Sequence, residues 1–299
     1  MTTGAEALRR RAPAAAAALD TVTDALWAEA AGSGTTTTVA AAAARSAGLL
    51  DLVPLRPPPP DGGAAAPWDG DEAAVLDFAT QCTLDVASVT ADQRAAFLEA
   101  AGPLAGSLAA ALWVVDVVPR TRAALDALFG AGPWPPSSAH PAAGGLWGAL
   151  DDLVRVVPAL DALDPVTSEL VRLRGARQHN CRLCRSLRSR SALRAGATEA
   201  DFAAVDDHAG SGLAAVARAA LAFTDAMVWT PGRIDPGVVV ALTAEATPDQ
   251  QVELVLDVTR NALNKVAVAL GADAAHVEEG VEVYDVGPDG SLVYGLEPD

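Results

Sequence analysis

The chain has 299 residues, of which 51% are hydrophobic and 4% aromatic, and its formal net charge at pH 7 is −17. The negative charge argues against a nucleic-acid partner, because phosphate binding requires a basic surface. Three cysteines are too few for a secreted disulfide scaffold, and no apolar run is clean enough to span a membrane, so we expect a cytoplasmic protein with no membrane contact.

Alanine and leucine are abundant, and this composition favours helices. Thr90 and Gln93 form a capping box at the start of one helix, and Pro119 predicts a kink or a break in the next. Two segments rich in proline and glycine are expected to be irregular connectors, and the second is the predicted domain boundary. The helices expected in this half cover 5–31, 39–50, 72–86, 90–101 and 103–129, and the connectors cover 54–71 and 130–145.

In the second half, Asp164 and Pro165 mark the start of a helix, and Asn180 is the predicted N-cap of a helix that ends at Gly196. The helices expected here cover 146–160, 165–177, 181–196, 199–206, 213–229, 236–246 and 248–270. The tail alternates around a Gly-Pro-Asp-Gly turn, which predicts a β-hairpin over residues 281–295.

The two halves share a pattern. Residues 113–130 align with 254–271, including an aspartate and a glycine in each, and Phe78 corresponds to Phe223. We interpret this as a duplication, although two alanine-rich helices could align by composition alone. The predicted organisation is a degenerate helical repeat (1–140), a second repeat that kept a cysteine pair (141–280) and a hairpin tail (281–299).

Cys181 and Cys184 form a C-x-x-C motif in a strongly basic stretch, 167–194, that contains eight arginines. Thiolates are the reactive form of cysteine, and nearby guanidinium groups favour them. One helical turn apart at a helix start, the two sulfurs would lie close enough to form a disulfide. Arg188 would then lie one turn beyond Cys184 on the same face, and we expect it to lower the pKa of Cys184.

Two other interpretations of the motif remain. It could be half of a zinc site, but His179 alone does not complete four ligands, and we expect no metal and no cofactor. The cysteines could also be buried structural thiols, although the flanking arginines make their burial costly.

Glu169, followed after eleven residues by the C-x-x-C, resembles the core motif of the alkylhydroperoxidase D-like, carboxymuconolactone decarboxylase family. The stretches ELVRLR, ALRAGATEADFAAV, ALAFTDAMVWTPGRIDP and DVTRNALNK extend the resemblance over residues 165–271. It implies an all-α fold of helical-bundle units that assembles into a homo-oligomer. It also implies that Cys184 is the peroxidatic thiol, Cys181 the resolving thiol and Glu169 a proton acceptor. The family's histidines are replaced here by Leu183 and Arg188, and His179 is a candidate substitute.

Two functions are compatible with these residues. The first is a thiol-dependent oxidoreductase, a peroxidase or disulfide-exchange enzyme, that acts on a hydroperoxide or disulfide and is recycled by a dithiol reductant. The second is a non-catalytic family member that binds an anionic small molecule or a partner subunit, with the cysteines as a redox sensor or a relic. Cys82 is expected in the core of the first repeat. Asn261, Asn264 and Lys265 resemble a family signature, but we favour helix packing and a local salt bridge for them.

Overall fold

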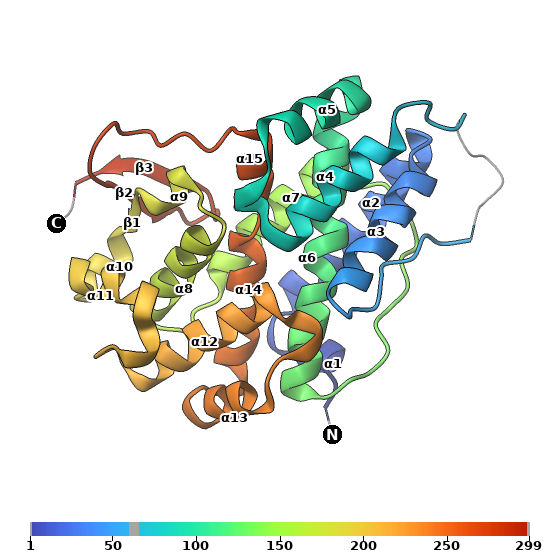
Figure 1. Cartoon of the computed structure of the whole chain (residues 1–299). Coiled ribbons are helices and arrows are strands. Elements are labelled where there is room, and N and C mark those ends of the chain that lie inside the picture. The colour runs from blue at the N-terminus through green and yellow to red at the C-terminus, as the bar shows by residue number, and fades with distance from the viewer. Residues whose placement is uncertain (1, 60–65, 298–299) are drawn as a thin grey trace.

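The computed structural model describes residues 2–59 and 66–297, which fold into packed helices with a small sheet at one end (Figure 1). Helix makes up 68% of the structure and strand 4%, so the predicted helical class is confirmed. The helices of the first half are α1 (Gly4–Arg11), α2 (Pro13–Gly32), α3 (Thr36–Leu49), α4 (Glu72–Asp85), α5 (Ala91–Ala101) and α6 (Ala105–Phe129). Those of the second half are α7 (Gly145–Val156), α8 (Pro165–Gln178), α9 (Arg182–Arg185), α10 (Arg190–Arg194), α11 (Glu199–Ala204), α12 (Ala215–Trp229), α13 (Pro236–Glu245), α14 (Pro248–Asn261) and α15 (Asn264–Leu270).

Helix starts follow the local capping signals. The Thr90 hydroxyl accepts from the backbone N–H of Gln93, and the Gln93 side chain accepts from the Thr90 N–H, each at 3.1 Å. The Asp164 carboxylate likewise accepts from the first N–H groups of α8, with Pro165 at the first helical position. These signals involve residues within three positions of one another, so both predicted starts are confirmed.

Three expected helices have different bounds in the structure. The first is divided at Ala12, because Pro13 begins a new helix, and the last is divided between Asn261 and Asn264. The second begins at Thr36 rather than at 39. Helix α6 continues through Pro119 without the predicted break. An internal proline costs about 3 kcal/mol, and burial of α6 from Leu108 to Leu125 offsets that cost.

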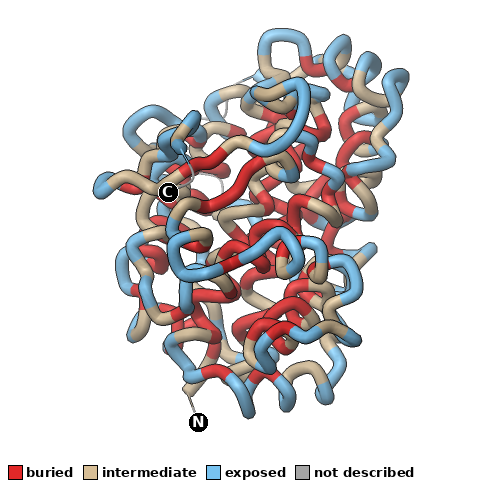
Figure 2. Tube along the Cα trace, turned by 90° about the vertical axis from the view of Figure 1, so that its left-hand side faces the viewer, coloured by how far each residue is buried: buried red, intermediate tan, exposed pale blue. Residues whose placement is uncertain are grey.

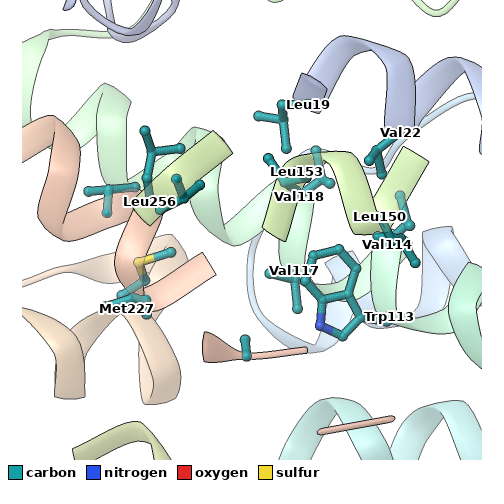
Figure 3. Close-up of a cluster of buried hydrophobic side chains, with 14 of the residues drawn as sticks. Leu19, Val22, Trp113, Val114, Val117, Val118, Leu150, Leu153, Met227 and Leu256 are labelled. Carbon is teal, nitrogen blue, oxygen red and sulfur yellow. The ribbon is translucent and has the colours of Figure 1, made fainter. Parts of the chain in front are cut away.

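Helices α2, α6 and α7 pack together in the core, and α12 and α14 extend it into the second half (Figure 3). The labelled core side chains are Leu19, Val22, Trp113, Val114, Val117, Val118, Leu150, Leu153, Met227 and Leu256. Buried residues run through the middle of the molecule, and exposed residues lie on the outer turns (Figure 2). The stretch Ala91–Phe129 is apolar and long enough to cross a membrane, but 67% of its most apolar part is buried in the protein, as in a core helix.

The connector 130–145 lies against the protein. The Trp134 indole donates to Asp126 at 3.1 Å, and the Ser138 backbone and hydroxyl both donate to Asp24. The other connector, 54–71, lies partly outside the described residues. The domain boundary at 140 remains a prediction, and α7, which follows it, packs against α2, which precedes it.

The sheet has the order β1 (Leu187–Ser189), β2 (Glu282–Val286), β3 (Leu292–Leu296). Strands β2 and β3 are antiparallel and form the predicted hairpin. Strand β1 pairs with β2 in parallel, with Leu187 opposite Glu282 and Ser189 opposite Tyr284. Strand β1 was not predicted from the sequence. Its pairing with β2 brings the C-terminal part of the chain against the segment that follows the cysteines.

Candidate dithiol site

The cysteines lie at the start of α9, a helix of a single turn. Asn180 adopts a left-handed conformation with φ of 53° and is not the N-cap. Cys181 takes that position, and its sulfur accepts a hydrogen bond from the backbone N–H of Cys184 at 3.2 Å. The predicted helix 181–196 is therefore wrong: it is divided into α9, β1 and α10, because the hairpin captures residues 187–189 as a strand.

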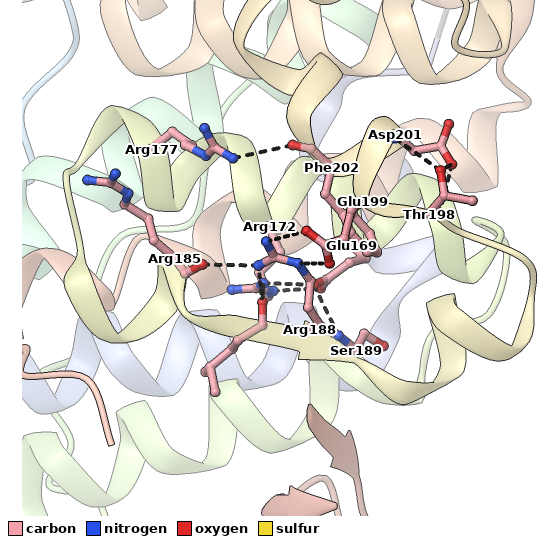
Figure 4. A network of polar contacts seen from close by, with 11 residues as sticks. Glu169, Arg172, Arg177, Arg185, Arg188, Ser189, Thr198, Glu199, Asp201 and Phe202 are labelled. Carbon is pink, nitrogen blue, oxygen red and sulfur yellow. Dashed lines mark hydrogen bonds and ion pairs between the residues drawn. The ribbon is translucent and has the colours of Figure 1, made fainter. Parts of the chain in front are cut away.

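Arg188 does not face Cys184. It lies in β1, where its guanidinium binds both carboxylate oxygens of Glu199 at 3.0 and 3.1 Å and lies over the Phe202 ring (Figure 4). The predicted position of Arg188 beside Cys184 is therefore wrong, and this position was the reason for expecting Arg188 to lower the pKa of Cys184. A strand directs its side chains differently from a helix, so the four-residue spacing no longer places Arg188 on the face of Cys184.

The basic stretch is largely neutralised by ion pairs. At least six of its eight arginines pair with carboxylates, most of which come from other parts of the chain. The pairs are Arg172–Glu169, Arg174–Asp225, Arg177–Asp206, Arg182–Asp273, Arg188–Glu199 and Arg190–Asp285. The expected island of free positive charge is therefore absent among these six residues.

The pKa values of the two thiols move in opposite directions. The hydrogen bond with Cys181 lowers the pKa of Cys184 to about 7, and the Arg172 charge and an Asn264 hydrogen bond act in the same direction against burial. The same thiol–thiol hydrogen bond, together with burial, raises the pKa of Cys181. Cys184 is therefore the thiol that ionises near neutral pH, and the more buried Cys181 stays protonated.

Glu169 is buried and fully engaged. Its two oxygens accept from Arg172 at 2.6 and 2.7 Å, from the Tyr284 hydroxyl at 3.0 Å and from the Ser189 backbone N–H at 3.1 Å (Figure 4). Arg172 in turn donates to the Cys184 carbonyl at 2.7 Å. Glu169 acts on Cys184 through that arginine.

His179 is buried rather than solvated. Its Nδ1 lies 2.8 Å from Asn264 Oδ1, and burial together with the Lys265 charge lowers its pKa to about 3. The imidazole is therefore neutral at physiological pH. The Asn264 side chain also contributes to lowering the pKa of Cys184, so Asn264 interacts with both His179 and Cys184.

The last segment of the proposed family signature joins the two halves of the protein. Lys265 forms a buried ion pair with Asp116, 149 positions away in α6, so the predicted local salt bridge is wrong. Asp116 also accepts from Arg120 at 2.8 Å. From the sequence, Asn264 and Lys265 were expected to serve in helix packing, and neither Tyr284 nor Asp273 was predicted to belong to the site.

Asp273 holds the start of α9. Its carboxylate accepts from the backbone N–H of Arg182 at 2.8 Å, and its carbonyl accepts from the N–H of Leu183 at 2.9 Å. The first N–H groups of α9 are therefore already hydrogen-bonded. In addition, the negative charge of the Asp273 carboxylate raises the pKa values of both cysteines. Within residues 2–59 and 66–297, no group of three or more His, Cys, Asp or Glu side chains could hold a metal ion.

Comparison with known proteins identifies two relatives in Mycobacterium tuberculosis, the uncharacterized proteins Rv2313c of strain H37Rv and MT2376 of strain CDC 1551 / Oshkosh. Each is 43% identical over 235 residues, which cover 75% of this chain and 81% of the relative. No model of a known protein family matches the chain, and no solved structure matches it. The chain belongs to the same protein family as Rv2313c and MT2376.

Proposed function

We propose that the protein is a thiol-dependent oxidoreductase that reduces a hydroperoxide or exchanges a disulfide through Cys184 and Cys181. The observation that carries this proposal is the position of the two cysteines in one helical turn, where the Cys184 N–H donates to the Cys181 sulfur at 3.2 Å. In this arrangement the pKa of Cys184 is lowered to about 7, whereas that of Cys181 is raised. This is the division of roles that a nucleophilic and a resolving cysteine require.

The reaction with a hydroperoxide has three balanced steps. The Cys184 thiolate attacks the terminal peroxide oxygen, the O–O bond breaks, and the leaving alkoxide takes a proton to become an alcohol. The Cys181 thiol then attacks the resulting sulfenic acid, so that a Cys181–Cys184 disulfide forms and water leaves. A dithiol reductant supplies two electrons and two protons and restores both thiols.

The neighbouring residues have positioning roles in this proposal. Arg172 and Asn264 stabilise the Cys184 thiolate, and Glu169 holds Arg172 in place. His179, neutral at physiological pH, fixes the orientation of Asn264.

We also propose that the halves are related bundle units of the alkylhydroperoxidase D-like type, and that the protein is a cytoplasmic homo-oligomer.

A redox sensor without turnover is the second candidate. It is favoured by the four hydrogen bonds that occupy Glu169, since a carboxylate held in this way is poorly placed to accept a proton from a substrate. A sensor would form the same disulfide but would not consume peroxide catalytically.

Peroxide consumption with dithiothreitol as reductant tests the proposal. We expect turnover in the parent protein and in Cys82→Ser, because burial raises the pKa of Cys82 to about 12 and makes it unreactive. Cys184→Ser should abolish turnover, and Cys181→Ser should accumulate a sulfenic acid that dimedone labels. Reversible disulfide formation without turnover would favour the sensor, and the absence of any Cys181–Cys184 disulfide after mild oxidation would refute both candidates.

A further inference from the structure

A second site lies behind the Glu169–Arg172 pair, away from the cysteines. It is a cavity of about 390 Å³ whose wall is formed by α8, α14, strand β2 and the loop before α8. Glu169 and Arg172 line it, whereas neither Cys181 nor Cys184 does. Its volume falls within the range of pockets that bind small molecules.

Two buried polar atoms at the wall have no hydrogen-bond partner among the described residues: Oδ2 of Asp257 and Nη2 of Arg260. Arg260 donates from Nε to the Val154 carbonyl at 3.0 Å, and Ser168 lowers the pKa of Asp257 against the larger effect of burial. Each residue therefore has one buried polar atom at the wall that no described residue satisfies. Buried polar atoms in native proteins are rarely left without a partner.

Asp257 and Arg260 are three positions apart on α14, so they project from neighbouring places on one helix face. They form no ion pair with one another in the part of the chain that the structure describes. A ligand with a hydrogen-bond donor and an acceptor a short distance apart could satisfy both atoms.

The charge at the wall defines the ligand further. Two of the acidic side chains there are already paired with arginines. Asp161 and Glu253, which accepts from the backbone N–H groups of Ala162 and Leu163, remain together with Asp257 against the single charge of Arg260. Burial raises the pKa of Asp257 to about 7, so this side chain is only partly ionised at neutral pH. This excess of negative charge disfavours a simple anion and favours a ligand whose donor is a cation.

We propose that this cavity binds a free amino acid, with the ammonium group at Asp257 and Glu253 and the carboxylate at Arg260. The site is independent of the dithiol chemistry. The described residues around it do not form a metal site, which separates this assignment from a cation site built on the same carboxylates.

Thermal unfolding in the presence of each standard amino acid at millimolar concentration tests this assignment. At least one should raise the Tm, increasingly with concentration, as a ligand that binds only the folded state must. The matching amine without the carboxylate, and the matching acid without the ammonium group, should bind at least about tenfold more weakly. Asp257→Asn and Arg260→Met should each weaken binding by a similar factor, whereas Glu278→Gln, at an exposed position, should not change it.

Ser168→Leu narrows the cavity without removing a charge and should also prevent binding, which guards against a charge variant that fails to fold. Cys184→Ser should bind normally, so failure of the dithiol proposal would leave this one intact. If no amino acid raises the Tm, the cavity holds only water and the proposal is overturned. Equal binding of the amine or of the acid would overturn the amino-acid assignment as well.

Discussion

Replacing Asn264 with alanine should make Cys184 a weaker acid. The Asn264 side chain lowers the pKa of Cys184, as a hydrogen-bond donor to the thiolate does. A hydrogen bond to a charged group contributes about 1.5–3 kcal/mol, and a pKa unit corresponds to about 1.4 kcal/mol. The pKa of Cys184 should therefore rise by about 1–2 units, from about 7.

This shift has a direct kinetic consequence. At pH 7 about half of the Cys184 side chains are thiolate in the parent protein, against about a tenth to a hundredth in Asn264→Ala. Alkylation of Cys184 by iodoacetamide should slow by about 5- to 50-fold at this pH. The rate, followed across a pH series by mass spectrometry of the cysteine-containing peptide, gives the pKa directly.

Arg188→Met is the matched control. Because the Arg188 guanidinium binds Glu199 and lies over Phe202, its removal should leave the pKa of Cys184 unchanged. The reasoning would be refuted if Asn264→Ala, still folded by circular dichroism, retained the parent pKa. It would also be refuted if Arg188→Met raised that pKa by a similar amount.

Three further predictions concern stability, each measured by urea unfolding. Lys265→Met leaves the buried Asp116 carboxylate with one cation fewer. The free energy of unfolding should therefore fall by about 3 kcal/mol. A decrease below about 1 kcal/mol would contradict the buried pair. Tyr284→Phe removes a donor from the Glu169 carboxylate and should cost about 1.5–3 kcal/mol, whereas an unchanged midpoint would argue against that hydrogen bond. Burial raises the pKa of Asp257 from 3.8 to about 7, so the folded state keeps a proton that the unfolded state releases between these values. Stability should therefore fall as the pH rises through this window, and Asp257→Asn should be increasingly stable relative to the parent between pH 5 and pH 8; parallel pH profiles would contradict the shift.

Much of the helical framework could be predicted from the sequence because its signals are local. The capping residues Thr90, Asp164 and Thr198 bond to N–H groups within three positions, as expected. The tail hairpin is specified in the same way, by a tight turn between alternating strands. The position of the thiol pair was also a matter of sequence, since Cys181 and Cys184 are three residues apart in any local structure.

The surroundings of the thiols depended on the tertiary structure. Strand β1 exists because residues 187–189 pair with a hairpin that lies more than 90 positions later in the chain, and this pairing removes Arg188 from the cysteines. Asp273 and Asp285, which neutralise two arginines of the basic stretch, are 91 and 95 positions away from them. Local propensity carries no information on which distant carboxylate will reach a given guanidinium.

The same limit applied to Asn264. Its residue type and its place in a helical segment are equally compatible with packing and with a hydrogen bond to a thiolate. Only the tertiary structure brings it close to both His179 and Cys184. The sequence by itself determined the helical class, the caps, the hairpin and the cysteine pair, because these depend on neighbours along the chain. The tertiary structure decided which charges are free, which thiol ionises and where the second cavity lies, because these depend on contacts between distant segments.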